Sequence, residues 1–247
     1  MSDDDSSDLV DYTLDSLDTE ELEHIKHAVR LVDVCRTYKS GKNKIEALQH
    51  IDLEVKLGDF VVVSGPSGSG KTTLLNVIGA IDLPSTGKVF VMDVPINDYD
   101  ESFRSSFRLN NTGFIFQSYN LVSTLTALEN VTFPMQLYDK PTMELRDDAM
   151  KLLERVGMDH RADHLPWQLS SGEQQRIAIA RAMANDPPVI LADEPTANLD
   201  GESGQMVREL LVSLNKMGKA VIVMTHDEGL VKQSGIRRFT MKGGELK

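Results

Sequence analysis

The sequence predicts an α/β fold, in which a mixed or parallel sheet is covered by helices. Short β-rich segments alternate with helical patterns along most of the chain, as expected for such a sheet. The segment at 59–65 is continuously apolar, which is typical of a strand buried on both faces. A helical pattern from about residue 126 to residue 165 interrupts the alternation. We therefore expect a core domain with a helical subdomain inserted into it.

In chain order, the first predicted strands cover 29–38 and 46–55 and are joined by the turn SGKNK. Together they predict an N-terminal antiparallel β subdomain. The strand at 59–65 leads into a glycine-rich loop and the helix TTLLNVIGA. A turn and a strand follow over 83–93, and a further strand covers 110–117.

The helical patterns TALENVTFPMQLY and TMELRDDAMKLLERVGM form the inserted subdomain, which we place at about 119–185. Strands return at 187–193 and 219–226, on either side of a helix at 201–218. The end, RRFTMKGGELK, predicts a closing strand and turn. The main domain is therefore expected to span 28–247, and no internal repeat is visible in it.

The negative charge of the chain is concentrated at its start. The net charge is -12, and residues 1–27 hold ten acidic residues and one lysine. We predict an acidic N-terminal extension over 1–27, disordered over 1–18, and a sequence compatible with a short helix over 18–29. The whole extension is expected to be either a solvated tail or a docking or regulatory segment. Charges elsewhere nearly balance, so no basic face predicts nucleic-acid binding.

Neither a membrane span nor a leader is visible. No apolar run approaches the roughly 18–20 residues that cross a bilayer, and the opening MSDDDSSD is unlike a signal peptide. We expect a cytoplasmic chain that reaches a membrane only through a partner. Cys35 is the only cysteine, which excludes an intramolecular disulfide and predicts no cysteine-based metal site. We expect it to be a buried structural thiol.

The segment GPSGSGKT at 65–72 lies between a strand and a helix, which is the context of a phosphate-binding P-loop. Glycines let backbone N–H groups face phosphates, and the helix adds its positive N-terminal end. Lys71 can reach the β- and γ-phosphates, and Thr72 offers a hydroxyl to Mg²⁺. The residues predicted to bind nucleotide here are Gly65, Pro66, Ser67, Gly68, Ser69, Gly70, Lys71, Thr72 and Thr73.

The segment VILADE at 189–194 predicts the other half of the nucleotide site. Its apolar residues form a buried strand, and Asp193 emerges at the carboxyl end, where open α/β sheets bind ligands. A carboxylate there holds Mg²⁺. Glu194 follows directly and either orients or deprotonates an attacking water, or else only caps the strand end.

Six elements occur in one order: GPSGSGKT, Gln117, LSSGE at 169–173, VILADE, NLD at 198–200, and His226. This order resembles the ATP-binding cassette family, the ATPase subunits of ABC transporters, over about residues 29–246. The segments SYNLVSTLTALENV, SGEQQRIAIARA and ILADEPTANLD resemble its macrolide-export and lipoprotein-release subfamily. The resemblance implies the ABC ATPase fold, with ATP and Mg²⁺ as cofactors.

The resemblance also assigns roles to residues that mean little alone. It implies that Gln117 contacts Mg²⁺ and the attacking water, and that His226 contacts the γ-phosphate. With Glu194 these are the predicted catalytic residues. The predicted metal ligands are Thr72, Gln117 and Asp193.

Ser170 and Glu173 predict a capping box at the start of a helix whose residues 177–180 belong to the core. The same segment resembles the family signature LSGGQ, in which Ser170 and Gly172 contact the γ-phosphate of ATP held by a second subunit. Both interpretations are compatible, because an open helix N-terminus is an anion site. The sequence departs from the signature at Ser171, where Gly is usual, and at Glu173, where Gln is common.

The resemblance also implies roles for Asp200 and Tyr38, whereas no chemical role is expected for Trp167. Asp200 belongs to the NLD loop, which crosses the family's dimer interface and contacts nucleotide. Tyr38 lies where the family places an aromatic residue under adenine, although an ordinary strand tyrosine is the alternative. Trp167 is expected to serve in packing.

The resemblance implies an ATPase subunit that drives a separate transmembrane permease, with export as the predicted direction. Two copies then form a head-to-tail homodimer upon ATP binding, peripheral on the inner face of the cell membrane. Apolar residues of 119–137 are expected to form a permease groove, core packing, or both: Leu121, Val122, Leu125 and Leu128. The alternatives are the ATPase of a signalling complex such as a cell-division regulator, and a soluble cassette protein of translation or DNA repair.

Overall fold

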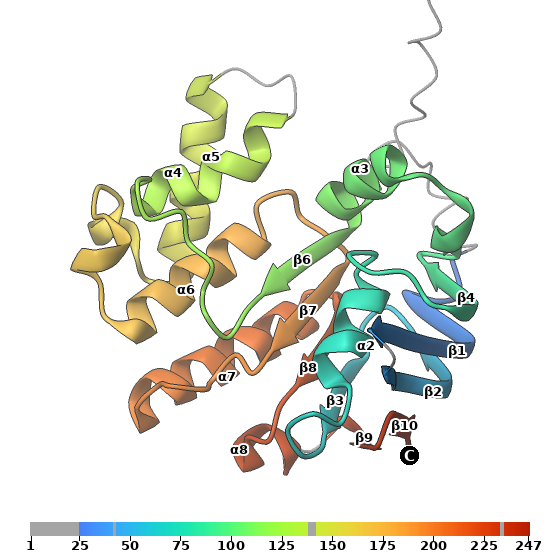
Figure 1. The fold of residues 1–247 in the computed structure, drawn as a ribbon. Helices are drawn as coiled ribbons and strands as arrows, with labels where there is room; N and C mark the ends of the chain where they lie inside the picture. Colours follow the sequence, from blue (N-terminus) through green and yellow to red (C-terminus); the bar gives the residue numbers. More distant parts are fainter. Residues whose placement is uncertain (1–24, 42, 138–141, 233–234) are drawn as a thin grey trace, which may run out of the picture.

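Two sheets on either side of one helix form the centre of the molecule (Figure 1). The structure, a computed structural model, describes residues 25–41, 43–137, 142–232 and 235–247. The helix between the sheets is α2 (Lys71–Ile78), which contacts strands of both. This arrangement confirms the predicted α/β class.

The larger sheet has six strands in the order β10-β9-β3-β8-β7-β6. Its first five strands in the chain pair in parallel, and β10 runs antiparallel to β9, so the predicted mixed sheet is confirmed. The strands are β3 (Phe60–Ser64), β6 (Thr112–Ile115), β7 (Val189–Asp193), β8 (Ala220–Met224), β9 (Arg237–Lys242) and β10 (Glu245–Leu246).

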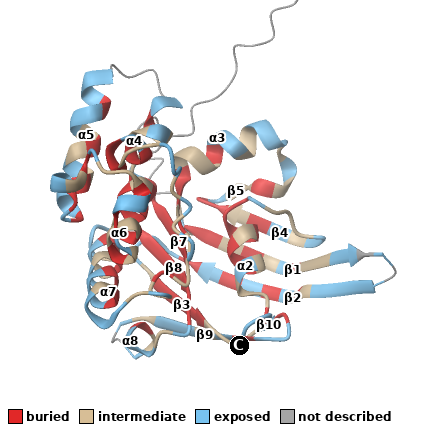
Figure 2. Ribbon diagram, turned by 60° about the vertical axis from the view of Figure 1, so that its left-hand side comes forward, coloured by how far each residue is buried: buried red, intermediate tan, exposed pale blue. Residues whose placement is uncertain are grey.

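The central strands β3, β7 and β8 are buried on both faces, as their apolar sequences require, whereas the edge strand β9 is mostly exposed. Within β3, Val61 and Val63 pack towards α2 and the smaller sheet, whereas Phe60 and Val62 pack towards the other helices. The two cores are therefore divided by the alternation of side chains along the strands. Figure 2 shows the buried residues concentrated along these central strands.

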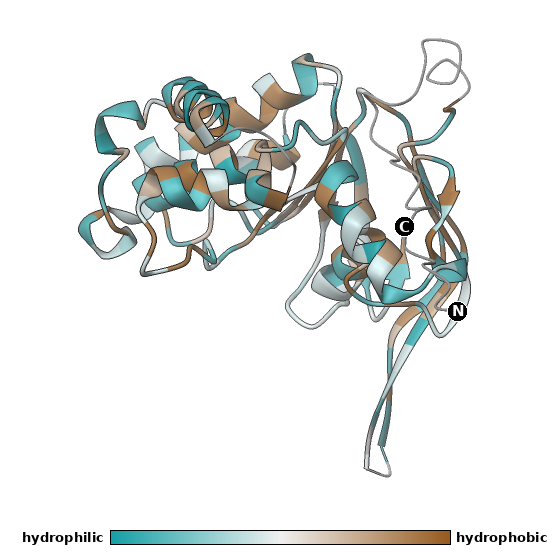
Figure 3. Cartoon of the chain, turned by 90° about the horizontal axis from the view of Figure 1, so that it is seen from above, coloured by the Kyte–Doolittle hydropathy of each residue, from teal (hydrophilic) through white to brown (hydrophobic). Residues whose placement is uncertain are grey.

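The smaller sheet has the order β2-β1-β4-β5 and its pairs are antiparallel, which confirms the predicted N-terminal β subdomain. Its strands are β1 (Val29–Ser40), β2 (Asn43–Val55), β4 (Thr86–Val91) and β5 (Val94–Pro95). The outer part of the β1–β2 hairpin projects beyond the sheet (Figures 2 and 3).

Helices cover the outer face of the large sheet (Figure 1). The part of the chain that connects β6 to β7 forms a helical lobe. A helical block was predicted there, and α4, α5 and α6 pack together in it. The helices are α3 (Glu101–Asn111), α4 (Ala127–Thr132), α5 (Thr142–Arg155), α6 (Ser171–Ala182), α7 (Gly201–Lys216) and α8 (Glu228–Val231). None of the helices in the described residues is long and apolar enough to span a membrane.

The start of the described chain differs from the prediction. The helix compatible with 18–29 falls mostly outside the described residues, and 25–28 are not helical. Instead, the backbone N–H groups of Lys26 and His27 donate to the Asp93 carboxylate, at 2.7 and 3.2 Å. These hydrogen bonds hold residues 26–27 against the smaller sheet, and the predicted cap at Asp18 and Glu21 lies outside the described residues.

Candidate functional site

The parallel strands bring four predicted site segments to one edge of the large sheet. The register pairs Val63 of β3 and Asp193 of β7 with Met224 of β8. Ile115 of β6 pairs with Ala192 of β7. The residues that follow these four strands therefore lie at the same edge, where open α/β sheets bind ligands.

The P-loop at this edge is shaped by glycines. Gly65 has φ +155° and Gly70 has φ +105°, and a Cβ would lie 2.1 Å from the Met241 carbonyl oxygen at the first position and 2.3 Å from that of Ala47 at the second. The loop therefore packs directly on the backbone of β9 and β2. Helix α2 begins without a side-chain cap, and the buried Ser69 hydroxyl lacks a partner in the described structure. Open N–H groups and a spare hydroxyl fit a phosphate.

Lys71 and Thr72, at the start of α2, face this loop and β7. The Lys71 ammonium donates to the carbonyl oxygens of Gly65 and Pro66, at 2.8 and 3.2 Å. Thr72 Oγ1 donates to Asp193 Oδ2 at 2.8 Å, and burial raises the pKa of that carboxyl. A hydroxyl and a carboxylate oxygen brought together in this way fit Mg²⁺, which prefers oxygen ligands.

Glu194 leaves β7 with a left-handed backbone, at φ +46°. Its N–H donates to the Met224 carbonyl oxygen at 2.8 Å, and its carboxylate accepts from the Thr225 hydroxyl at 3.2 Å. His226 Nδ1 lies 3.0 Å from the same carboxylate. The Glu194 side chain is largely buried, whereas that of His226 is 77% exposed. Two of the predicted catalytic side chains are thus in direct contact.

Gln117 lies two residues beyond β6 and is exposed. The last pair between β6 and β7 is Ile115–Ala192, and Gln117 and Glu194 each lie two residues beyond it along the chain. All three predicted catalytic residues therefore follow the carboxyl ends of adjacent strands, although their roles stay predictions.

Several polar residues that sequence reasoning missed hold this edge together. Asp227 Oδ2 accepts from the Thr196 hydroxyl at 2.7 Å and from the Arg208 guanidinium at 2.9 Å. Burial acts to raise the pKa of Asp227, but these hydrogen bonds bring it below its usual value. Gln175 of α6, fully buried, donates from Nε2 to the Pro195 carbonyl oxygen at 2.8 Å. The sequence signals were a carboxylate next to His226 and one polar residue on the buried face of α6.

The predicted capping box of α6 is confirmed. The Ser170 hydroxyl accepts from the Glu173 N–H at 3.3 Å, and the Ser170 N–H donates to the Glu173 carboxylate at 2.8 Å. The latter bond keeps the pKa of Glu173 below its usual value. A Cβ on Gly172 would lie 2.4 Å from Ser203 Oγ on α7, so the two helices meet at their N-termini.

Asp200 caps α7, accepting from the Ser203 N–H at 2.8 Å. Ser203 thus contacts both Asp200 and the Gly172 position, and the two predicted dimer-facing segments share one region. Within the described residues, no hydrogen bond or ion pair joins Ser170 to the P-loop; its partner is Glu173.

Two aromatic residues are placed in ways that the sequence did not indicate. The Tyr38 hydroxyl donates to Asp82 Oδ2 at 2.6 Å, and the Arg36 guanidinium lies 4.7 Å from the centre of the Tyr38 ring. Its adenine-binding role stays a prediction. Trp167 is 74% exposed in the 3-10 turn Pro166–Gln168, directly before α6. The packing role expected for Trp167 is therefore wrong.

Comparison with known proteins identifies the family. The family model described as ABC transporter matches residues 48–197, which include the P-loop, the capped α6 segment, Asp193 and Glu194. The chain belongs to the ABC transporter family. It is the ATP-binding and ATP-hydrolysing component of such a system.

Individual ABC relatives align over most of the chain. The ABC transporter ATP-binding protein MJ0796 of Methanocaldococcus jannaschii is 45% identical over 223 residues, covering 88% of this chain and 94% of that protein. Its dimeric structure in a post-hydrolysis state, bound to ADP and Pi, has a TM-score of 0.83 at 43% identity and covers 89% of this chain and 96% of that one.

Two relatives carry names that specify a transport system. The lipoprotein-releasing system ATP-binding protein LolD of Idiomarina loihiensis is 43% identical over 206 residues, covering 83% of this chain and 90% of that protein. The macrolide export ATP-binding/permease protein MacB of Chlorobaculum tepidum is 39% identical over 216 residues. That match covers 87% of this chain and 33% of MacB.

Proposed function

We propose that this ABC ATPase powers an exporter, acts as a head-to-tail homodimer, and drives a permease made by separate chains. The observation that carries its chemistry is the meeting of Thr72–Asp193 and Glu194–His226 at the carboxyl ends of adjacent strands. Export is favoured by the similarity to LolD and MacB, whose names specify release and export. The chain then lies on the inner face of the cell membrane through its permease.

The residues present fit ATP and Mg²⁺. The open N–H groups of α2 and the Lys71 ammonium would hold the phosphates, while Thr72, Asp193 and Gln117 would hold the metal. Bound Mg²⁺ neutralises the phosphate charge that develops during transfer. The Glu194 carboxylate, buried and fixed by Thr225, orients the attacking water and takes its proton, and His226 positions the γ-phosphate.

The second copy is inferred from the incomplete surroundings of the α6 N-terminus. Ser170 is exposed and Trp167 next to it is 74% exposed, which is unusual for the largest apolar side chain. The structure of the relative MJ0796 is dimeric. A partner P-loop that carries ATP would cover this surface and complete two sites at once.

The permease contact is inferred at a cavity of about 240 Å³ beside the loop that follows Gln117. Phe133 is exposed at its rim, and Leu137, farther along the same turn, is 72% exposed. Of the leucines predicted for a groove or the core, Leu128 is buried. Val122, from the same set, is exposed.

Arg181 connects this cavity to the site. Its guanidinium donates to the carbonyl oxygens of Tyr119, at 2.7 Å, and of Asn120. The loop after Gln117 is therefore fixed to α6, and α6 carries Ser170 at its other end. A permease element seated here would move both predicted nucleotide contacts together.

The test uses the tagged full-length chain, purified in detergent with the membrane protein that binds it. We expect Phe133→Asp to lower the recovered permease at least tenfold while ATP binding is unchanged. Met143→Asp, at an exposed position on α5, is the matched control and should retain the permease. Full recovery with Phe133→Asp would contradict the proposed contact.

The function itself is tested by reconstituting that complex in vesicles. Nucleotide-dependent movement of a solute out of the ATP-containing compartment supports an exporter. Hydrolysis that moves no solute would instead indicate a non-transport signalling complex. Movement towards the ATP-containing side would contradict the proposed direction.

A further inference from the structure

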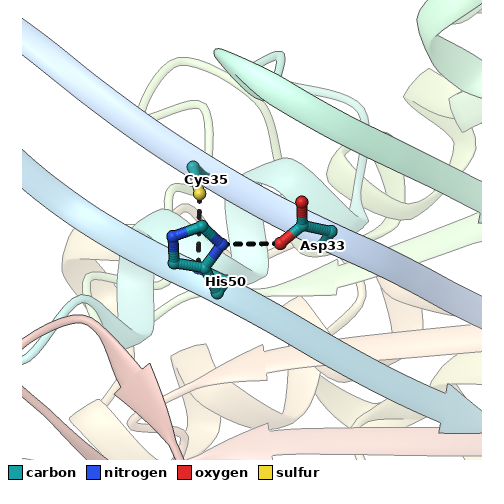
Figure 4. Close-up of side chains that lie close together, drawn as sticks. All are labelled: Asp33, Cys35 and His50. Atoms are coloured by element: carbon teal, nitrogen blue, oxygen red, sulfur yellow. Dashed lines mark hydrogen bonds and ion pairs between the residues drawn. The ribbon is translucent and has the colours of Figure 1, made fainter.

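A mixed group of metal-ligating side chains lies on the smaller sheet, apart from the predicted nucleotide site. Asp33 and Cys35 are on β1 and His50 is on β2. One ligand atom from each residue lies within 4.8 Å of the other two. Figure 4 shows the three side chains together between the two strands. Carboxylate, thiolate and imidazole are all zinc ligands.

Irregular strand pairing creates this arrangement. Asp33 has φ +50° and His50 has φ +48°, and the β1–β2 register shifts between Leu31 and Val34 and again before Arg36. Such bulges turn side chains away from the regular alternation.

The neighbouring strand fixes the bulge. A Cβ on Gly87 of β4 would lie 2.3 Å from the Asp33 carbonyl oxygen, so the backbones approach closely there. The Ser85 N–H donates to the Cys35 carbonyl oxygen at 2.7 Å. Contacts with Ser85 and Gly87 therefore fix the backbone positions of Asp33 and Cys35.

Contacts within the group prepare it for a cation. His50 Nδ1 lies 2.6 Å from Asp33 Oδ1, and the His50 N–H donates to Cys35 Sγ at 3.2 Å. These contacts turn the Asp33 carboxylate, the Cys35 sulfur and the His50 ring towards one another. The Asp33 and His50 side chains are exposed, so an ion and a completing water can reach them.

We propose that Asp33, Cys35 and His50 bind a zinc-like divalent ion, with water as a fourth ligand. The ion would replace the proton shared by His50 and Asp33 and the proton of the Cys35 thiol, so both are released to solvent. Ligand atoms on one tetrahedral Zn²⁺ are about 3.3–3.6 Å apart, as its bond lengths require. The ligand atoms of the three residues already lie within 4.8 Å of one another, so side-chain rotations would bring them to these separations. A thiolate ligand disfavours Mg²⁺.

This site revises the expectation that a single cysteine predicts no cysteine-based metal site. Asp33 and Cys35 lie on β1 and His50 lies on β2, so the three residues do not form a metal-binding sequence motif. Cys35 is partly exposed rather than buried. None of the three residues is among those assigned to nucleotide, so the site stands independently of the proposed function.

The test titrates the reduced, chelator-treated, nucleotide-free full chain with Co²⁺ and then with Zn²⁺. Because the chain has one cysteine, a thiolate-to-Co²⁺ absorption band can only come from Cys35. We expect the band to saturate at one Co²⁺ per chain and to disappear when Zn²⁺ is added. Zn²⁺ should also slow chemical modification of the Cys35 thiol at least tenfold.

Variants decide whether all three residues take part. Cys35→Ser should abolish the band, and His50→Ala and Asp33→Asn should each weaken Co²⁺ binding at least tenfold. His160→Ala is the matched control, since His160 is an exposed histidine beside Asp159; it should bind as the unaltered chain does. Absence of the band, or an unchanged Co²⁺ affinity in His50→Ala, would overturn the proposal.

Discussion

At the scale of single residues, the site depends on backbone positions as much as on side chains. Glu194 keeps its left-handed conformation because Met224 and Thr225 bind its N–H and carboxylate. Asp193 and Glu194 could be predicted from the sequence, because they stand at the end of one continuous apolar segment. Asp227 and Arg208 were not predicted, because their contact joins α7 to the loop after β8 and leaves no local pattern.

Asp227 should be required for the stability of this edge. Asp227→Ala leaves the partly buried Arg208 without its carboxylate, so we expect the free energy of unfolding to fall by about 1–3 kcal/mol. Glu228→Ala, which removes an exposed neighbouring carboxylate, should change it by less than about 0.5 kcal/mol. Urea unfolding measures both. Equal effects of the two variants would contradict the structural role given to Asp227.

At the scale of elements, predictions held where the pattern was local. The capping box of α6 follows from residues three apart, and the buried strands follow from continuous apolar runs. Helix α3 was not predicted, although Asp100 caps it by accepting from the Phe103 N–H. The contact between α6 and α7 at Gly172 was also beyond prediction, since it depends on how two helices pack.

That contact can be tested by a double-mutant cycle. Gly172→Ala should destabilise the fold by about 1–3 kcal/mol, because its Cβ meets Ser203 Oγ. Ser203→Gly makes room for the added methyl group. The double variant should therefore be more stable than the sum of the single changes by more than about 1 kcal/mol. Additive effects in urea unfolding would show that the helices do not meet there.

The α6 cap should also respond to pH through Glu173, which the Ser170 N–H holds at a lowered pKa. A carboxyl with a lowered folded-state pKa stabilises the fold above its ordinary pKa, about 4.3. That stabilisation is lost as the pH falls through the folded value. Glu173→Gln keeps an acceptor for Ser170 but cannot titrate.

The measurement compares urea midpoints of the unaltered chain and Glu173→Gln at pH 7 and near pH 3.5. We expect the advantage of the unaltered chain over the variant to be smaller at the lower pH. A difference that is the same at both pH values would show that the charged cap contributes nothing.

At the scale of the whole molecule, the fold class and the order of elements could be predicted from periodicity. The sheet edge that gathers the P-loop, Glu194 and His226 follows from parallel pairing, which the α/β alternation indicates. The separate antiparallel sheet was also predicted, from the two strands joined by the turn SGKNK. The packing of α2 between the two sheets and the projection of the β1–β2 hairpin could not be predicted, because they depend on tertiary packing. Neither could the exposure of Trp167 beside the α6 N-terminus.

We propose that each ATP is held between two copies of the chain. The mass of Glu194→Gln in solution, measured by light scattering with ATP and with ADP, tests this arrangement. Trp167 is the only tryptophan, so its emission reports separately whether the surface before α6 becomes covered.

With ATP we predict twice the monomer mass of 27.4 kDa and a blue shift of Trp167 emission. With ADP we predict a monomer with unshifted emission. A chain that binds ATP yet stays at 27.4 kDa, with Trp167 still in water, would contradict the shared nucleotide site.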